Sequence, residues 1–266
     1  MNIPLGKDTT YTSQYSPDAL APISRETSRE GMEQPLPFVG ADIWNAWELT
    51  WLKENGHPEI AAAVIKFPAS SPNIIESKSL KLYLGSFAMT RIGSAEAVRE
   101  RIGNDLGEAA GSPVDVSLMT EKDHRPALIG KLPGLCLDKL DVECSDDSPN
   151  ASLLSCAGET VREELHSHLF RSLCPVTSQP DLASIYINYT GRRIDEESLL
   201  RYIVSFREHQ DFHEACVERM FVDIQSACAP EKLCVYARFA RRGGIDINPW
   251  RASYDALMPN VRLWRQ

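Results

Sequence analysis

The chain has 266 residues, of which 43% are hydrophobic and 24% charged. These proportions are typical of a globular protein and exclude a collagen-like, coiled-coil or fully disordered chain. The 28 Lys and Arg residues against 37 Asp and Glu residues give a net charge of −9, which argues against direct binding of nucleic acid, because that binding depends on basic side chains. No apolar run approaches the roughly 18 residues of a membrane span, and residues 1–34 lack the apolar core of a signal peptide. We therefore expect a cytoplasmic protein without a membrane contact.

The cysteines are odd in number, and none of them forms a Cys-x-x-Cys pair. This pattern argues against a disulfide framework and against a cysteine-rich zinc site, so we expect free thiols and no metal. Most free thiols pack as small apolar side chains, and one of them is a candidate for chemistry. The seven are Cys136, Cys144, Cys156, Cys174, Cys216, Cys228 and Cys234.

Residues 1–35 show no sustained periodicity and predict a loosely ordered arm. Residues 47–51 alternate apolar with polar side chains, as in a half-buried strand. Asn55-Gly56 predicts a hairpin before a second strand over residues 60–67. Apolar residues at helical spacing then predict helices over residues 80–87 and from Ser94, a good N-cap, to about residue 106. Strands are expected over residues 114–118 and 137–144.

A Ser/Asp/Pro/Asn run at residues 145–152 predicts a linker, after which the same order of elements returns. Strands are expected over residues 159–169 and 185–189, helices over 195–208 and 212–228, and strands over 233–239 and 245–250. The predicted fold is therefore α+β, with an arm (residues 1–35) and two modules (36–150 and 151–266). Each module would be an antiparallel β-β-α-α-β-β sheet with two helices on one face.

The loop from Cys174 to Asp181 joins two predicted strands and carries two prolines, so it has a defined shape. A reactive cysteine needs a stabilised thiolate, and a nearby carboxylic acid can protonate the group that sulfur attacks. The alternative is that Cys174 only packs and Asp181 only caps the loop.

Phe212-His213-Glu214 lies at the start of a predicted helix. A carboxylate is favourable at a helix N-terminus, and Glu214 could also accept two N–H bonds from a guanine-like ring edge. A helix-start carboxylate beside a surface histidine is the alternative.

Basic residues occur at two places where backbone N–H groups could also contribute to anion binding. Lys78 and Lys81 lie at the start of the first predicted helix, and Arg241-Arg242-Gly243-Gly244 is a turn after a strand. A phosphate could bind at either place, although the lysine stems could instead only cover apolar surface. No G-x-G-x-x-G follows a strand, so a Rossmann fold is not supported.

Together these segments resemble the long, two-module form of the NADPH-dependent 7-cyano-7-deazaguanine reductases. These are the nitrile reductases of queuosine biosynthesis, and they share the tunnelling fold with GTP cyclohydrolase. The resemblance runs from about Ala41 to the end of the chain. Its motifs are residues 76–83, 174–181, 212–214 and 241–249.

The resemblance implies a role for individual residues. Cys174 matches the nucleophile that forms a covalent thioimide with the nitrile carbon, Asp181 the acid that protonates the nitrile nitrogen, and His213 a residue that assists proton transfer. Leu182 follows the acid where this family often has Trp, which we expect to loosen local packing without removing a reacting group. The implied substrate contacts are Ile75, Glu76, Ser77, Phe212, His213 and Glu214, and the implied NADPH contacts are Ser77, Lys78, Arg242 and Gly243.

The implied reaction reduces 7-cyano-7-deazaguanine, a small-molecule nitrile, to 7-aminomethyl-7-deazaguanine with two NADPH per turnover, in the pathway of tRNA queuosine modification. A homodimer is implied as well. The Cys/His/carboxylate set by itself would also permit a cysteine hydrolase of nitriles or amides, but the basic segments argue against it because hydrolysis uses no dinucleotide. A non-catalytic purine-binding tunnelling-fold module is the third alternative.

Overall fold

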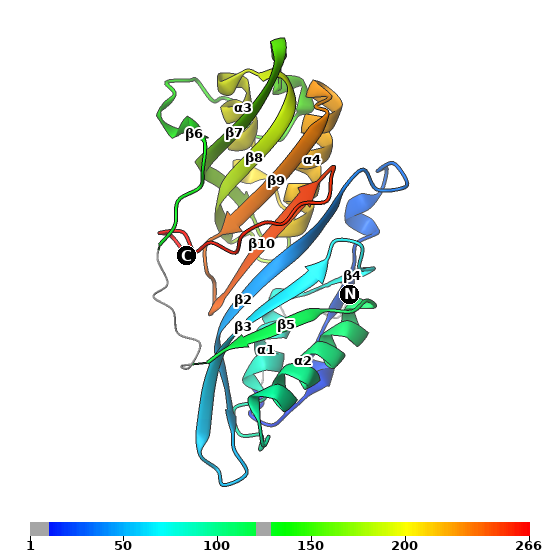
Figure 1. Ribbon diagram of the computed structural model, residues 1–266, viewed down its shortest axis with the longest axis vertical. Coiled ribbons are helices and arrows are strands. Elements are labelled where there is room, and N and C mark those ends of the chain that lie inside the picture. The colour runs from blue at the N-terminus through cyan, green and yellow to red at the C-terminus, as the bar shows by residue number, and fades with distance from the viewer. Residues whose placement is uncertain (1–10, 121–128) are drawn as a thin grey trace. The chain divides into compact units, whose positions relative to one another are not determined.

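The computed structural model describes residues 11–120 and 129–266 (Figure 1). The chain divides into two compact units, and each is assembled from segments that are distant in sequence. The described residues of the first unit are 11–30, 41–120 and 241–247. Those of the second unit are 31–40, 129–240 and 248–266. The turn with the two arginines thus belongs to the first unit, and the Cys174 loop belongs to the second.

The sheet of the first unit contains β2 (Val39–Leu52), β3 (Pro58–Pro68) and β5 (Asp115–Met119), with β3 antiparallel to both neighbours. The predicted hairpin is confirmed: Gly56 has a φ of 84°, which a glycine adopts without steric cost. The register of β2 shifts between Ala46 and Leu49. As a result Leu49 and Trp51 are buried while Trp47 is only half-buried.

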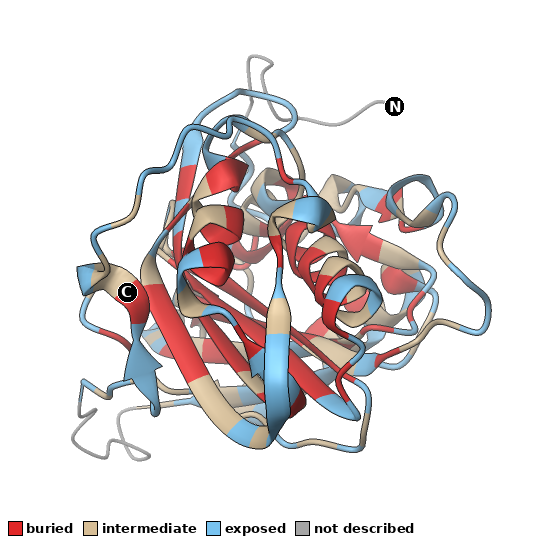
Figure 2. Ribbon diagram, turned by 90° about the horizontal axis from the view of Figure 1, so that it is seen from above, coloured by how far each residue is buried: buried red, intermediate tan, exposed pale blue. Residues whose placement is uncertain are grey.

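Both predicted helices of the first unit are confirmed as α1 (Ser77–Gly85) and α2 (Ala95–Ala110). The Ser94 side chain caps α2 by accepting the N–H of Ala97, and Gly111 ends it with a φ of 69°. The apolar residues at spacings of three and four are the buried ones, and α2 packs against β5. Figure 2 shows buried residues along the strands and on one side of the helices.

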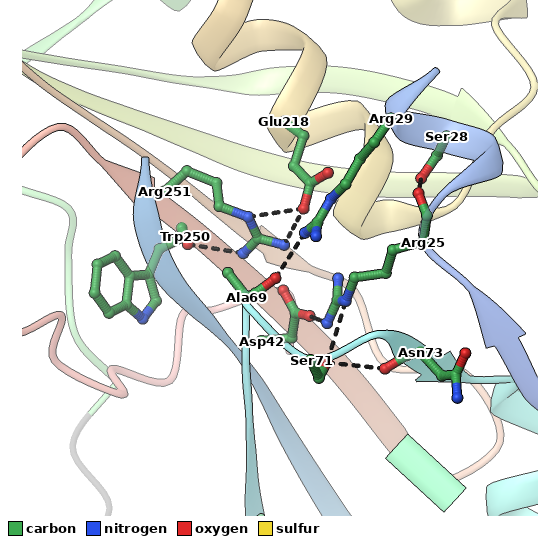
Figure 3. Close-up of polar contacts among 10 residues, drawn as sticks. All are labelled: Arg25, Ser28, Arg29, Asp42, Ala69, Ser71, Asn73, Glu218, Trp250 and Arg251. Carbon is green, nitrogen blue, oxygen red and sulfur yellow. Dashed lines mark hydrogen bonds and ion pairs between the residues drawn. The ribbon is translucent and has the colours of Figure 1, made fainter. Parts of the chain in front are cut away.

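The expectation of a loosely ordered N-terminal arm is wrong for residues 22–29. Strand β1 (Pro22–Ser24) pairs with β4 (Asn73–Ile75), and a 3-10 turn, Thr27–Arg29, follows. Between them Arg25 is buried and donates to Asp42 at 2.5 Å and to the Ser71 hydroxyl at 3.2 Å (Figure 3). These buried polar contacts fix the segment in a way that apolar periodicity does not reveal.

The second unit contains the strands β6 (Leu135–Cys136), β7 (Cys156–Leu173), β8 (Pro180–Ile194), β9 (Lys232–Phe239) and the end of β10 (Ile245–Ala252). They pair in this order; β6 is parallel to β7 and the other pairs are antiparallel. Helix α3 (Glu196–Val204), extended by a 3-10 turn (Ser205–Glu208), packs against β7, and α4 (His213–Cys228) packs against β9. The predicted β-β-α-α-β-β order from residue 156 onward is confirmed.

A buried ion pair joins α4 to β10 within the second unit. The Nε and Nη2 atoms of Arg251 lie 3.0 and 2.7 Å from one oxygen of Glu218, and both side chains are at most 1% exposed. Nη1 donates to the carbonyl of Trp250 (Figure 3). The guanidinium is thereby held by charge-assisted hydrogen bonds on both sides.

The strand expected at residues 137–144 is wrong. The chain forms a 3-10 turn, Leu137–Lys139, directly after the two-residue strand β6. The Asp138 carboxylate accepts hydrogen bonds from the Ser167 hydroxyl and from the backbone N–H of His168. A side chain thus occupies a backbone donor of β7 that a paired strand could have used. The α+β class itself is confirmed. Among the described residues, no helix is long and apolar enough to cross a bilayer.

Candidate active site

Cys174 lies in a closed loop between β7 and β8. Its N–H donates to the carbonyl of Gln179 at 2.9 Å, and its carbonyl accepts the N–H of Ser178 at 2.9 Å. Ser178 has a φ of 55°, the left-handed conformation needed to turn the chain back. Cys174 is 7% exposed, and Asp181, the second residue of β8, is 4% exposed. The loop thus presents a thiol and a carboxyl from adjoining strand ends.

The segment before α4 runs beside this loop. The Leu173 N–H donates to the carbonyl of His209 at 2.8 Å, and the Asp211 N–H donates back to the carbonyl of Leu173 at 3.1 Å. The side chain of Gln210 donates to the Ser178 hydroxyl at 2.9 Å. These bonds fasten the start of α4 next to the residue that precedes Cys174.

The structure brings two of the predicted catalytic residues into direct contact. The Nε2 atom of His213 lies 3.3 Å from Oδ2 of Asp181. The imidazole stacks on the ring of Phe239, with centroids 3.8 Å apart and planes at 23°. The stacking fixes the ring plane, so the nitrogen keeps its direction toward the carboxyl. A carboxyl and an imidazole in contact can hold and pass a proton between them.

The other two residues of the Phe212-His213-Glu214 motif start α4. Phe212 is the half-buried N-cap residue, and Glu214 is 4% exposed in the first turn, where a carboxylate is favourable. Leu182, which follows the predicted acid, is 42% exposed. Its side chain therefore lies largely outside the core.

Three other cysteines of the second unit are poor candidates for the nucleophile. Burial raises the pKa of Cys216 well above its ordinary value and raises those of Cys228 and Cys234 to about 12. These thiols stay protonated at neutral pH and are poor nucleophiles. Cys174 lies instead in the loop that leads to Asp181.

In the first unit, the turn predicted to bind NADPH adjoins helix α1. Arg242 and Ile245 exchange backbone hydrogen bonds, and the two residues between them have positive φ values of 57° and 79°. A Cβ atom added to Gly243 would lie 2.9 Å from Nζ of Lys81. Lys81 is one helical turn after Lys78, so α1 and the turn gather basic groups at one place. The sequence predicted Lys78 and Lys81 together as a possible phosphate site, although the resemblance implied only Lys78 as an NADPH contact.

Arg241 orients this turn. Its guanidinium lies 4.5 Å from the ring centroid of Trp47, and its Nε atom lies 3.9 Å from Asp246. Asp246 also accepts from the Trp47 indole at 2.8 Å and from the Asn45 amide at 2.6 Å. Arg241 therefore contacts the scaffold of the first unit, and Arg242 is the arginine predicted to contact the cofactor.

The expectation that an anion uses free N–H groups at the start of α1 is wrong for two of those groups. The Glu76 carboxylate accepts the N–H groups of Lys78 and Ser79, both at 2.8 Å, and is 1% exposed. Glu76 thus acts as the N-cap of α1. Ile75 is 2% exposed and belongs to the core, while Ser77 is exposed at the surface. The sequence alone did not indicate that Glu76 closes the helix end, because glutamate is an uncommon N-cap residue.

The comparisons with known proteins cover both halves of the chain. The family described as "Nitrile reductase, 7-cyano-7-deazaguanine-reductase N-term" matches residues 11–118, and the family described as "QueF-like protein" matches residues 180–257. The NADPH-dependent 7-cyano-7-deazaguanine reductase of Bordetella pertussis (strain Tohama I) is 50% identical over 100% of this chain and 98% of its own length. The chain belongs to this reductase family. The reductase of the same name from Burkholderia ambifaria (strain MC40-6) is 52% identical over 99% of this chain and 98% of its own length.

Among solved structures, the apo form of an archaeosine synthase QueF-Like protein matches 38% of this chain and 99% of that chain, with 17% identity and a TM-score of 0.33. A likeness at this level carries no argument about function. Cys174 itself precedes the second family match, which begins at residue 180 and includes Asp181. The role of Cys174 therefore stays a prediction, supported by the geometry of its loop.

Proposed function

We propose that the chain catalyses the NADPH-dependent reduction of 7-cyano-7-deazaguanine to 7-aminomethyl-7-deazaguanine, the reaction that the names of its relatives indicate. The observation that carries the proposal is the contact of His213 with Asp181, beside the closed loop that begins at Cys174. A thiol, a carboxyl and an imidazole are the groups that addition to a nitrile needs.

In this proposal the Cys174 sulfur forms a bond to the nitrile carbon, and the nitrile nitrogen takes a proton held by Asp181. The product of that step is a covalent thioimide, whose C=N bond is a better hydride acceptor than the nitrile. NADPH supplies one hydride to the thioimide carbon and, after the C–S bond breaks, one hydride to the resulting imine. His213, 3.3 Å from Asp181, returns protons to the carboxyl between the two reductions. Two hydrides and two protons convert the nitrile into the primary amine.

Substrate recognition is assigned to groups near the start of α4. Glu214 is a buried carboxylate that can accept two N–H bonds from the pyrimidine edge of a deazaguanine. Phe212, half-buried at the N-cap, supplies an aromatic face for the ring. Ile75, Glu76 and Ser77 of the first unit are proposed as further contacts, Glu76 through the helix start that it caps.

The basic turn of the first unit fits the phosphate groups of NADPH. Arg242 and Lys78 provide charge, and Gly243 is exposed where a Cβ atom would meet Lys81. A glycine in this conformation lets the backbone approach a phosphate closely. Ser77, exposed at the start of α1, adds a hydroxyl donor.

The family resemblance further supports a cytoplasmic homodimer. Sedimentation of the full chain would measure the dimer directly. A monomer at micromolar concentration that still turns over would contradict this part of the proposal without affecting the reaction.

The reaction is tested by stoichiometry. We expect two NADPH oxidised for each 7-aminomethyl-7-deazaguanine formed, measured by NADPH absorbance and by mass spectrometry of the product. The same incubation without NADPH should give no multiple turnover. Release of an amide or acid without NADPH would instead indicate a cysteine hydrolase, and binding without turnover in either condition would indicate a purine-binding module.

A further inference from the structure

A second group of reactive side chains lies in the second unit, apart from the proposed catalytic residues. Cys136, His166 and His168 each offer one ligand atom, and these atoms all lie within 4.8 Å of one another. The sequence predicted no metal, because it contains no Cys-x-x-Cys pair and because Cys136 is thirty residues from the histidines. Strand pairing removes that separation.

The backbone explains why the three side chains meet. Cys136 ends β6, which pairs in parallel with β7, and its Cα partner there is His166. Paired residues on neighbouring strands project to the same face of a sheet. His166 and His168 are two residues apart on β7, and their rings lie edge to face with centroids 5.3 Å apart. The cluster therefore follows from register and is not a chance contact of long side chains.

In both histidines the Nδ1 atom makes a hydrogen bond, which leaves the second ring nitrogen for a metal ion. Nδ1 of His166 lies 2.9 Å from the carbonyl of Pro133, which only accepts, so Nδ1 carries the proton and Nε2 has a lone pair. Nδ1 of His168 lies 2.7 Å from the Ser184 hydroxyl. A metal-binding histidine commonly donates its second N–H to such a group, which fixes its tautomer and orientation.

The charge around the cluster and the burial of its histidines also suit a bound cation. His166 is 8% exposed and His168 is half-buried, so both imidazoles are partly shielded from water. The Asp138 carboxylate accepts the backbone N–H of His168 at 2.9 Å and brings negative charge close to the cluster. It offsets Arg265, which donates to the carbonyl of His168 at 2.5 Å. Cys136 is exposed, so an ion can reach the group.

We propose that Cys136, His166 and His168 bind a zinc ion, with the fourth position taken by water. Two imidazoles and one thiolate are ligands that zinc prefers, whereas Mg²⁺ and Ca²⁺ prefer oxygen. Tetrahedral bonds of zinc place ligand atoms roughly 3.3 to 3.6 Å apart, and the three ligand atoms here lie within 4.8 Å of one another. The bound ion fastens the two-residue strand β6 to β7. The proposed site is separate from Cys174, which follows His168 by six residues, roughly 20 Å along an extended chain.

The three ligands lie between the two stretches that the family matches cover, residues 11–118 and 180–257. The zinc site thus does not depend on the proposed reductase reaction. Its occupancy can be measured without substrate or NADPH.

The test uses the full chain, stripped with a chelator and then titrated with zinc chloride under a thiol-free reductant. We expect one zinc per chain by elemental analysis, a higher melting temperature, and a loss of affinity of at least roughly ten-fold in Cys136→Ser and in His168→Ala. Cys144→Ser is the matched control, because Cys144 is also exposed and lies outside the cluster. It should bind zinc like the wild type.

Cobalt(II) in place of zinc gives a second readout. The wild type and Cys144→Ser should show a thiolate-to-cobalt charge-transfer band and intense visible bands of a tetrahedral site, and Cys136→Ser should lose the charge-transfer band. Circular dichroism of the metal-free variants distinguishes loss of a ligand from loss of the fold. A wild type that binds no stoichiometric zinc, or Cys136→Ser that binds zinc as tightly as the wild type, would overturn the proposal.

Discussion

Glu76 is the residue for which the structure and the family resemblance imply different roles, and replacing it separates them. Its two carboxylate oxygens accept the N–H groups of Lys78 and Ser79 at 2.8 Å while the side chain is 1% exposed. Glu76→Ala would leave both N–H groups without these acceptors. Each unsatisfied buried donor costs about 1–3 kcal/mol, and loss of an N-cap costs about 0.5–2 kcal/mol. Both figures describe the loss of the same hydrogen bonds and are therefore not added in full, so we expect the unfolding free energy to fall by about 2–4 kcal/mol.

For a chain of this size such a loss lowers the melting temperature by roughly 4 to 16 °C. The measurement is a thermal melt followed by circular dichroism, with Glu108→Ala as control, because Glu108 is an exposed glutamate in α2. The control should stay within about 0.5 kcal/mol of the wild type. If Glu76→Ala melts together with the control, the capping role is refuted. A Glu76→Gln variant that melts like the wild type but has a raised KM for the nitrile would assign Glu76 to substrate binding.

Three further predictions concern stability and cofactor binding. Glu218→Ala leaves Arg251 buried without its carboxylate and should cost about 3–5 kcal/mol in urea unfolding. Gly243→Ala places a Cβ atom 2.9 Å from Lys81 Nζ at a φ of 57°, so KM for NADPH should rise several-fold with kcat little changed in steady-state kinetics. Burial raises the pKa of Cys234 to about 12 from 9.0, so the unfolded state loses this proton first. This thiol alone should therefore lower the unfolding free energy by about 1.4 kcal/mol per pH unit between about pH 9 and pH 12, and the fall should be less steep by that amount in Cys234→Ala.

Elements that depend on local periodicity could be predicted from the sequence. The alternation around Leu49 and Trp51, the Asn55-Gly56 turn and the Ser94 cap each act within a few residues, and the structure has each of them. The apolar residues of α4 that recur at helical spacing are likewise buried: Cys216, Val217, Met220, Phe221 and Ile224. Each of these patterns shows which side of one helix or strand is buried, and it can be recognised without knowing which other elements cover that side.

The features that the sequence did not indicate depend on contacts between distant segments. Arg25 is ordered because it reaches Asp42 and Ser71, and the polar N-terminal composition does not show this. The chain after Cys136 turns away because the Asp138 side chain bonds β7 in place of a strand. Of the predicted site, the Asp181 and His213 contact required the pairing of β7 with β8 and the placement of α4. The resemblance supplied their roles, and the structure supplied their distance.

The most direct test of the proposed mechanism is intact-mass spectrometry of the full chain mixed with 7-cyano-7-deazaguanine in the absence of NADPH. The wild type should gain the mass of one substrate molecule, because thiol addition to a nitrile loses no atoms. Cys174→Ala should gain nothing, whereas Cys216→Ala, which removes a buried thiol of raised pKa, should still gain it. An adduct that persists in Cys174→Ala, or a wild type that forms none, would contradict the assignment of Cys174 as the nucleophile.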